Sequence, residues 1–80
     1  MNRELARHVV MAGFHSASVL QDLLPMLKTH CDNNEYNQYL KAISSVSVEL
    51  TLEIFNKIFA EYPDLKEEVD AKILKYGKFI

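Results

Sequence analysis

Apolar residues in the middle of the chain recur at three- and four-residue steps, the spacing of one face of an α-helix. This pattern runs from Asn34 to Tyr62 without a break and contains two apolar stripes. The first consists of Tyr36, Leu40, Ile43, Ser47, Leu50, Ile54 and Ile58, and the second of Val48, Leu52, Phe55, Phe59 and Tyr62. A helix that is wetted on one side needs only one stripe, so the pattern predicts a long helix with two packing neighbours.

A second long helix is predicted over residues 3–28. Its main stripe, called the Leu5–Leu27 stripe below, consists of Leu5, Val9, Ala12, Ser16, Val19, Leu23 and Leu27. We expect this stripe to cover the first stripe of the 34–62 helix. Pro25 lacks a backbone donor and should kink or restart the last turn. Gly13 costs about 1 kcal/mol of helix stability relative to alanine, so it indicates either a close helix–helix approach or a tolerated weakness.

Helix-end signals divide the rest of the chain. Residues Asp32, Asn33 and Asn34 are good helix caps, Pro63 suits the first position of a helix, and Gly77 is a natural stop. The third helix, over about 63–76, carries the stripe Leu65, Val69, Ile73 and Tyr76. The sequence therefore predicts one all-α domain over residues 1–80, with helices over about 3–28, 34–62 and 63–76. The short 29–33 connection predicts that the first two form a long antiparallel hairpin.

Several apolar residues remain after these stripes are paired. Val10, Met11 and Phe14 turn away from the Leu5–Leu27 stripe toward a side where water is expected. We therefore expect two hairpins to pair into a dimeric helical bundle, or the chain to bind a protein partner. The predicted partner or dimer surface consists of Val10, Met11, Phe14, Ala17, Val48, Leu52, Phe55, Phe59, Phe79 and Ile80. The alternative is a monomer whose third helix wraps across the pair and covers Phe14.

Composition narrows the function. With 80 residues, a net charge of −2 and dispersed lysines, the chain does not resemble a protein that binds nucleic acid by neutralising phosphates. No apolar run approaches the roughly 20 residues that span a bilayer, so no membrane partner is expected. Cys31 is the only cysteine, which suits a reducing compartment and predicts a cytoplasmic location.

Residues capable of chemistry do not form a known motif. His8, His15 and Asp22 are spaced by seven, which is roughly 10.5 Å along a helix and too far for two of them to share a metal ion. There is no zinc motif, no nucleophile elbow and no phosphate-binding glycine loop. We therefore expect a non-enzymatic interaction or adaptor protein without cofactor or metal. The alternative is a bundle that binds a small ligand or metal through His8, His15 and the tyrosines.

Overall fold

The computed structural model describes residues 1–80 and contains helices and turns but no strand. The prediction of an all-α fold with three helices is confirmed, although two of the three are interrupted. The first consists of α1 (Arg3–Gln21) and α2 (Leu23–His30). The second consists of α3 (Asn33–Glu49), the π-helical segment η1 (Leu50–Phe55) and α4 (Asn56–Glu61). The third is α5 (Pro63–Tyr76).

Polar side chains and special backbone residues fix the ends of these helices. The Asn2 side chain accepts a hydrogen bond from the Leu5 amide, and the Asp32 side chain accepts one from the Glu35 amide, both at 2.8 Å. Each satisfies a backbone donor that the first helical turn leaves free. Pro63 opens α5, and Gly77 ends it in the left-handed conformation with φ of 75°. This conformation suits glycine because it has no Cβ.

The interruption between α1 and α2 lies one turn before a proline. Asp22 separates the two segments, and its backbone amide still donates to the Ser18 carbonyl at 3.0 Å. Pro25 has no amide hydrogen to give the Gln21 carbonyl and its ring crowds that carbonyl, so the helical ladder is disturbed there.

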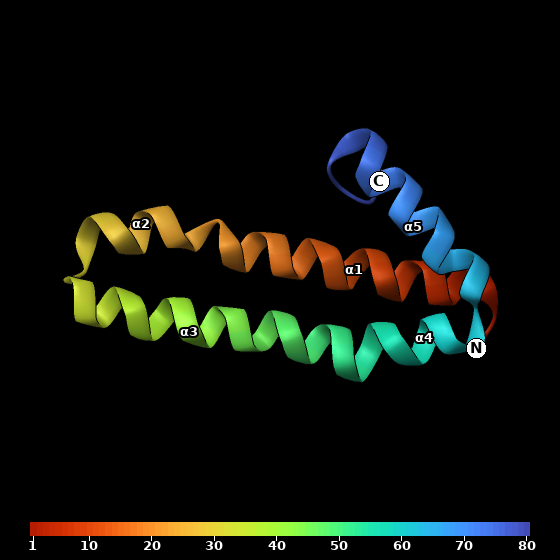
Figure 1. The fold of residues 1–80 in the computed structure, drawn as a ribbon, viewed down its shortest axis with the longest axis horizontal. Coiled ribbons are helices and arrows are strands. Elements are labelled where there is room, and N and C mark those ends of the chain that lie inside the picture. The colour runs from red at the N-terminus through yellow and green to blue at the C-terminus, as the bar shows by residue number, and fades with distance from the viewer.

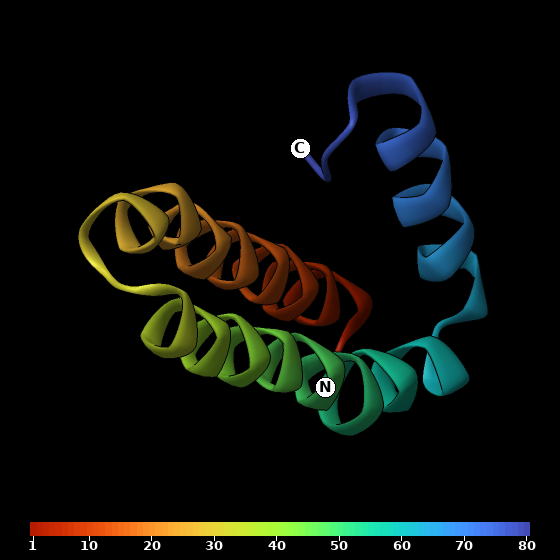
Figure 2. The same cartoon turned by 60° about the vertical axis from the view of Figure 1, so that its left-hand side comes forward.

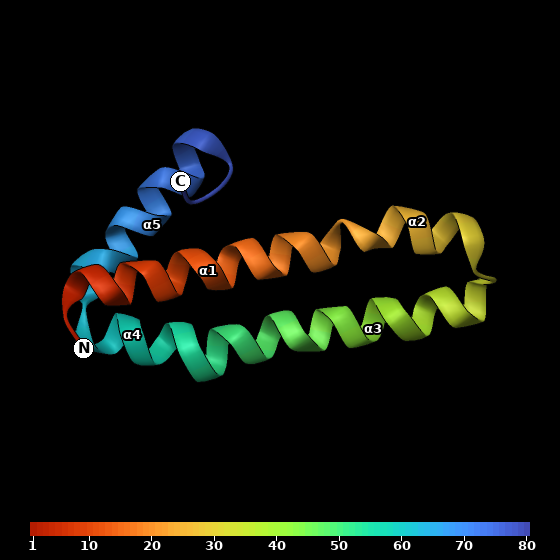
Figure 3. The ribbon, with the colours of Figure 1, turned by 180° about the vertical axis from the view of Figure 1, so that it is seen from behind.

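The two long segments lie side by side and run in opposite directions (Figures 1 and 3). They are joined by residues 31–32 at one end, whereas α5 begins at the other end, beside the start of α1. Figure 2 shows α5 leaning away from the pair while the C-terminal residues turn back toward α1. The molecule is accordingly elongated, with principal extents of 45 × 25 × 16 Å.

The π-helical segment η1 changes which residues of the second long segment face α1. A π-turn closes over one more residue than an α-turn, so it shifts the residues that follow by about one position, or about 100°. Continuing from the buried Ile43, an unbroken α-helix would turn Ile54 toward α1 and Phe55 away from it. The structure instead buries Phe55 and leaves Ile54 exposed.

The expectation of two separate apolar stripes along the whole 34–62 helix is corrected by this shift, although the segment does contact both α1 and α5. Ile43 belongs to the first predicted stripe and Phe55 to the second, yet both are buried in the structure. The two stripes are largely one packing face whose phase changes at η1. Val48 and Leu52, which lie on the second stripe before the shift is complete, remain exposed.

Most of the core lies at the end of the molecule where α5 joins the pair. One cluster contains seven buried residues: Ala6, Val10, Phe55, Ile58, Leu65, Val69 and Phe79. Toward the opposite end, where α2 and the first half of α3 form only two layers, Ile43 is the one buried side chain. The chain exposes 5837 Å², whereas a compact monomer of this mass exposes about 4,900 Å². Its radius of gyration is 14.7 Å, against about 12 Å for a compact domain of this length.

The expected role of the Leu5–Leu27 stripe is also corrected. Leu5, Val19 and Leu23 are exposed, as are the small residues Ala12 and Ser16, and only Val9 and Leu27 are half-buried. The residues of α1 that are buried instead are Ala6, Val10 and Gly13. Helix α1 therefore packs through a face rotated away from its most regular apolar stripe, because α5 supplies partners for Val10.

Candidate interaction surfaces

One face of the antiparallel pair carries apolar side chains that the chain leaves uncovered. On the first long segment these are the exposed members of the Leu5–Leu27 stripe, and on α3 they are Tyr39 and Val46. We call this surface the open face: Leu5, Ala12, Ser16, Val19, Leu23, Tyr39 and Val46. It holds five large exposed apolar side chains on one side of the pair, and apolar surface of this kind is a candidate interaction site.

Helical geometry places both sets on the same side of the pair. Angles about each helix axis are counted in the direction of increasing residue number, at about 100° per residue. On this scale the α1 stripe lies roughly 80° before Gly13, which faces the second segment. Tyr39 and Val46 lie roughly 40–60° before Ile43, which faces the first segment. Because the two segments are antiparallel, rotation in the same sense leads to the same face. The opposite face is the one that α5 and the C-terminal residues cover.

On the covered face, aromatic rings surround the only glycine within a helix. The Phe14 and Phe55 rings stack with centroids 4.7 Å apart and an interplanar angle of 13°. Phe79 meets Phe14 edge to face at 6.3 Å and 70°. A Cβ placed on Gly13 would lie 2.5 Å from Cε1 of Phe55. Gly13 therefore permits a close approach between the two long segments, which was one of the two interpretations of this residue.

A groove of about 490 Å³ lies between α1 and the C-terminal residues. Its walls combine one side of α1 with Ile73 and the turn that follows α5. The lining residues are Met11, Phe14, His15, Ala17, Ser18, Gln21, Ile73, Gly77, Lys78, Phe79 and Ile80. The lining thus combines apolar side chains with the polar His15, Ser18 and Gln21 of α1 and with Lys78.

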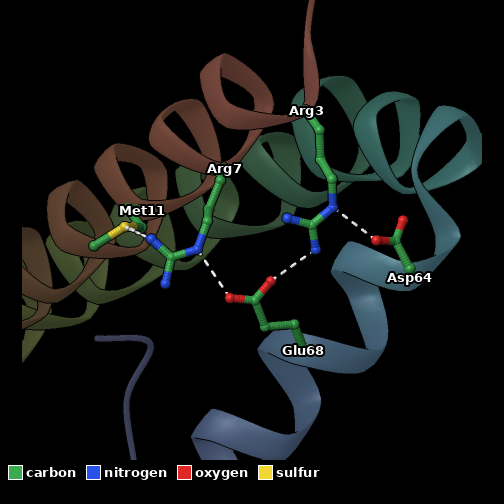
Figure 4. A network of polar contacts seen from close by, with 5 residues as sticks. All are labelled: Arg3, Arg7, Met11, Asp64 and Glu68. Atoms are coloured by element: carbon green, nitrogen blue, oxygen red, sulfur yellow. Dashed lines mark hydrogen bonds and ion pairs between the residues drawn. The ribbon is translucent and has the colours of Figure 1, made fainter.

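Ion pairs attach α5 to α1 beside this groove (Figure 4). Arg3 Nε lies 2.7 Å from Asp64 Oδ2, and Arg3 Nη2 lies 2.9 Å from Glu68 Oε2. Arg7 Nε lies 2.9 Å from Glu68 Oε1, so Glu68 bridges both arginines. The Arg7 guanidinium also lies 5.1 Å from the centre of the Phe79 ring, a cation–π contact. These contacts join α5 and the C-terminal residues to the first two turns of α1.

The same ion pairs shift the pKa values of their members. Hydrogen bonds from Arg3 lower the pKa of Asp64 below its ordinary value. Hydrogen bonds from Arg7, and then from Arg3, lower the pKa of Glu68, although partial desolvation opposes the shift. The hydrogen bonds to Asp64 and Glu68 raise the pKa of the Arg3 guanidinium. Both carboxylates are therefore charged at neutral pH.

The ten residues predicted to form a partner or dimer surface occupy different environments. Val10, Phe55 and Phe79 are buried within the chain. Met11, Phe14 and Ala17 are half-buried in the wall of the groove, which the exposed Ile80 also lines. Phe59 is half-buried against the core, whereas Val48 and Leu52 are exposed. The structure thus brings five of the ten to one groove: Met11, Phe14, Ala17, Phe79 and Ile80.

The exposure expected for Val10 is corrected by these positions. Its side chain is fully buried, in the same cluster as Leu65 and Val69 of α5. A charge pattern in the sequence signals this contact: Arg3 and Arg7 are four residues apart, as are Asp64 and Glu68. Two helices with matched charges at this spacing can pair along one side, so α5 lies over the Val10 side of α1.

The residues considered for metal or ligand binding lie apart. No group of three or more His, Cys, Asp or Glu side chains is placed to hold a metal ion. His15 lines the groove, whereas His8 is exposed outside it. Tyr36 is half-buried and Tyr39 exposed, both at the far end of the pair. The half-buried Cys31 has a raised pKa because its thiol hydrogen-bonds Glu35 and is partly desolvated, so it remains protonated at neutral pH.

Comparisons with known proteins add no relative. No family model matches the chain, and neither a curated protein nor a solved structure matches it. None of the helices has the length and apolar character required to cross a membrane.

The open face is the surface that sequence reasoning missed. Its main stripe was recognised but assigned to the interior of the hairpin. Two features of the sequence could have indicated otherwise. The middle of the stripe is occupied by Ala12 and Ser16, which fill little space, while the opposite side of α1 offers the larger Val10 and Phe14.

Proposed function

We propose that this protein is a small non-enzymatic interaction or adaptor protein that binds another helical protein surface through its open face. In this proposal the two long segments form a helical hairpin, and the hairpin contributes two helices to a dimeric helical bundle. The observation that carries the proposal is that five of the seven residues of the Leu5–Leu27 stripe are exposed, because an apolar stripe of helical period lies against another helix in stable proteins. Docking by apolar helical faces with polar borders is a recurring mode of recognition.

The surface area supports the same proposal. The chain exposes 5837 Å², which exceeds the value for a compact monomer of this mass by about 900 Å². A stable protein–protein interface of standard size removes about 800 Å² from each partner. Half of the molecule is only two helices thick, and a second helical pair placed on the open face would supply the missing layer.

A charge placed on the open face tests this proposal. Val19→Glu should weaken association at least about tenfold, because an unpaired carboxylate would enter an apolar interface. Leu74→Glu is the matched control, since Leu74 is 90% exposed on α5 and lies outside the open face. Sedimentation velocity measures self-association, and retention of native co-purifying protein measures binding to other partners. Equal behaviour of the two variants in both measurements, with unchanged circular dichroism, would refute the proposal.

The groove between α1 and the C-terminal residues supports a second candidate function. Its volume of about 490 Å³ lies within the range of roughly 300–1,000 Å³ that is usual for small-molecule sites. Of the residues proposed for ligand binding, His15 lines it, so the groove favours a small amphiphilic ligand over a metal ion. Titration calorimetry with decanoate tests this candidate, with His15→Ala as the variant. Binding that is absent, or equal in both proteins, would contradict it.

A further inference from the structure

We infer that the open face binds a second copy of this chain, with the two α1 helices antiparallel about a two-fold axis at the level of residue 14. This inference rests on the proposed function, since it names the occupant of the same surface. It requires the surface of one copy to be complementary to itself, because a two-fold interface uses the same patch on both subunits.

The residues of the stripe meet this requirement in sequence order. Leu5 and Leu23 lie nine residues on either side of position 14, Val9 and Val19 lie five, and Ala12 and Ser16 lie two. In an antiparallel pair centred there, Leu5 faces the second copy's Leu23, and Val9, which borders the open face and is half-buried against the core, faces its Val19. Ala12 faces the second copy's Ser16. Each residue thus meets one of the same or similar size. Only the small Ala12 and Ser16 oppose each other at the centre, where the two helices approach most closely.

The small central residues also set how closely the helices approach. Ala12 and Ser16 are both exposed, and the Ser16 hydroxyl donates to the Ala12 carbonyl within its own helix at 2.8 Å. The hydroxyl therefore enters an interface with its hydrogen-bonding need already met. Larger leucine and valine side chains on either side close the contact toward its ends.

In the proposed dimer, Leu50 of the neighbouring segment lies on the same two-fold axis. Leu50 is half-buried, and Val46 and Ile54 lie four residues on either side of it. Both flanking residues are exposed. The same two-fold axis therefore brings Val46 of one copy opposite the second copy's Ile54. Ile54 is exposed beside the open face because η1 turns Phe55 toward α1 in its place. The π-helical segment therefore affects both the core and the proposed dimer interface.

The excess exposed area of the whole chain is large enough to accommodate a dimer interface of standard size. The excess exposure of each chain is about 900 Å², and a standard interface buries about 800 Å² on each side. Stacking two such pairs produces a four-helix bundle, in which α5 of each copy stays on the outer face. No rearrangement of the ion pairs between α1 and α5 is needed.

Disulfide cross-linking between two tagged variants tests the geometry. Ala12→Cys and Ser16→Cys are prepared separately with different affinity tags, both with Cys31→Ser to remove the native thiol. In the proposed dimer, position 12 of one copy lies level with position 16 of the other. Two copies of position 12 are instead offset by about 6 Å along the axis, which places their Cα atoms beyond the roughly 7 Å limit for a disulfide.

We expect mild oxidation of the mixture to form the mixed disulfide about tenfold faster than either variant alone forms a homodimeric one. Faster homodimeric cross-linking would show a parallel pair and overturn the inference. Equal or undetectable cross-linking in all three samples, with helicity retained, would also overturn it.

Failure of this inference is distinguishable from failure of the proposed function. If the wild-type chain sediments as a monomer at high concentration while Val19→Glu abolishes binding to a co-purifying protein, the function stands and the second copy is excluded. If the mixed disulfide forms, both stand.

Discussion

Gly13 lies where the Phe55 ring crosses α1, and there is no room for a methyl group between them. A Cβ at this position would lie 2.5 Å and 2.7 Å from two atoms of the ring. Alanine favours a helix over glycine by about 1 kcal/mol, but overpacking a core costs typically about 1–3 kcal/mol. We expect the packing cost to be larger, because Phe55 is buried between Gly13 and Phe14. Gly13→Ala should therefore lower the free energy of unfolding by about 1–2 kcal/mol in urea denaturation.

A double variant separates the packing cost from the helical gain. In a Phe55→Leu background the ring is gone, so Gly13→Ala should be neutral or stabilising there. If Gly13→Ala destabilises both backgrounds equally, the contact with the Phe55 ring is not the reason for the glycine. The sequence alone left two interpretations of Gly13. The residue that lies against it is Phe55 only because η1 rotates the second long segment, and the sequence did not reveal that rotation.

The helical elements show what the sequence could predict and what it could not. The predicted limits 3–28, 34–62 and 63–76 lie close to those of the structure because local signals set them. Asp32, Pro63 and Gly77 act through hydrogen bonds and backbone geometry within a few residues. The phase of the packing face after Leu50 depends instead on contacts with α1, more than 30 residues away in sequence. A π-turn leaves no distinct residue signature, so its effect resembled a second stripe.

Deleting one residue within η1 tests the phase shift. The π-turn accommodates one extra residue, so removing Thr51 allows the segment to become a regular α-helix. Phe55 then has the same rotation about the helix axis as in the wild type and still faces α1. We expect this variant to keep its helicity and most of its stability. Deletion of Asn56 is the control, because it rotates Ile58 by about 100° out of the core and should cost more than about 2 kcal/mol. Similar losses in thermal unfolding for both deletions would contradict this account of η1.

The attachment of α5 to α1 depends on charged carboxylates. The pKa of Glu68 is lowered in the folded chain from an ordinary value of 4.5, and that of Asp64 from 3.8. A lowered pKa stabilises the fold fully above the ordinary value, and this stabilisation is lost as the pH falls through the folded value. Glu68→Gln should thus lower the urea midpoint more at about pH 7 than at about pH 3.

Glu67→Gln is the matched control for this measurement, because it removes the same charge from the adjacent residue, which is exposed. Its midpoint should follow that of the wild type at both pH values. A Glu68→Gln variant that loses as much stability with acidification as the wild type would show that the ion pairs of Glu68 with Arg3 and Arg7 do not hold α5.

At the scale of the whole molecule, the large exposed surface and the concentration of the core at one end are the features that support the proposed dimer. A small domain has a thin stability margin, and a second copy bound only to the folded state would add to it by mass action. The urea midpoint of the wild type should therefore rise with protein concentration. At a total concentration about a hundredfold above the dissociation constant, only about 7% of the chains are free monomers, so dimerisation should add about 1.6 kcal/mol per chain.

One substitution at two positions shows whether the open face causes this dependence. Ser16→Lys places a charge at the centre of the proposed interface, so its midpoint should be lower and independent of concentration. Ser45→Lys makes the same change on an exposed side of α3 that points away from α1, and it should keep the dependence. A concentration dependence that survives in Ser16→Lys would show that the chain associates through another surface. The exposed residues Val48 and Leu52 would then be the first to test. A wild-type midpoint that does not change with concentration would exclude the binding of a second copy.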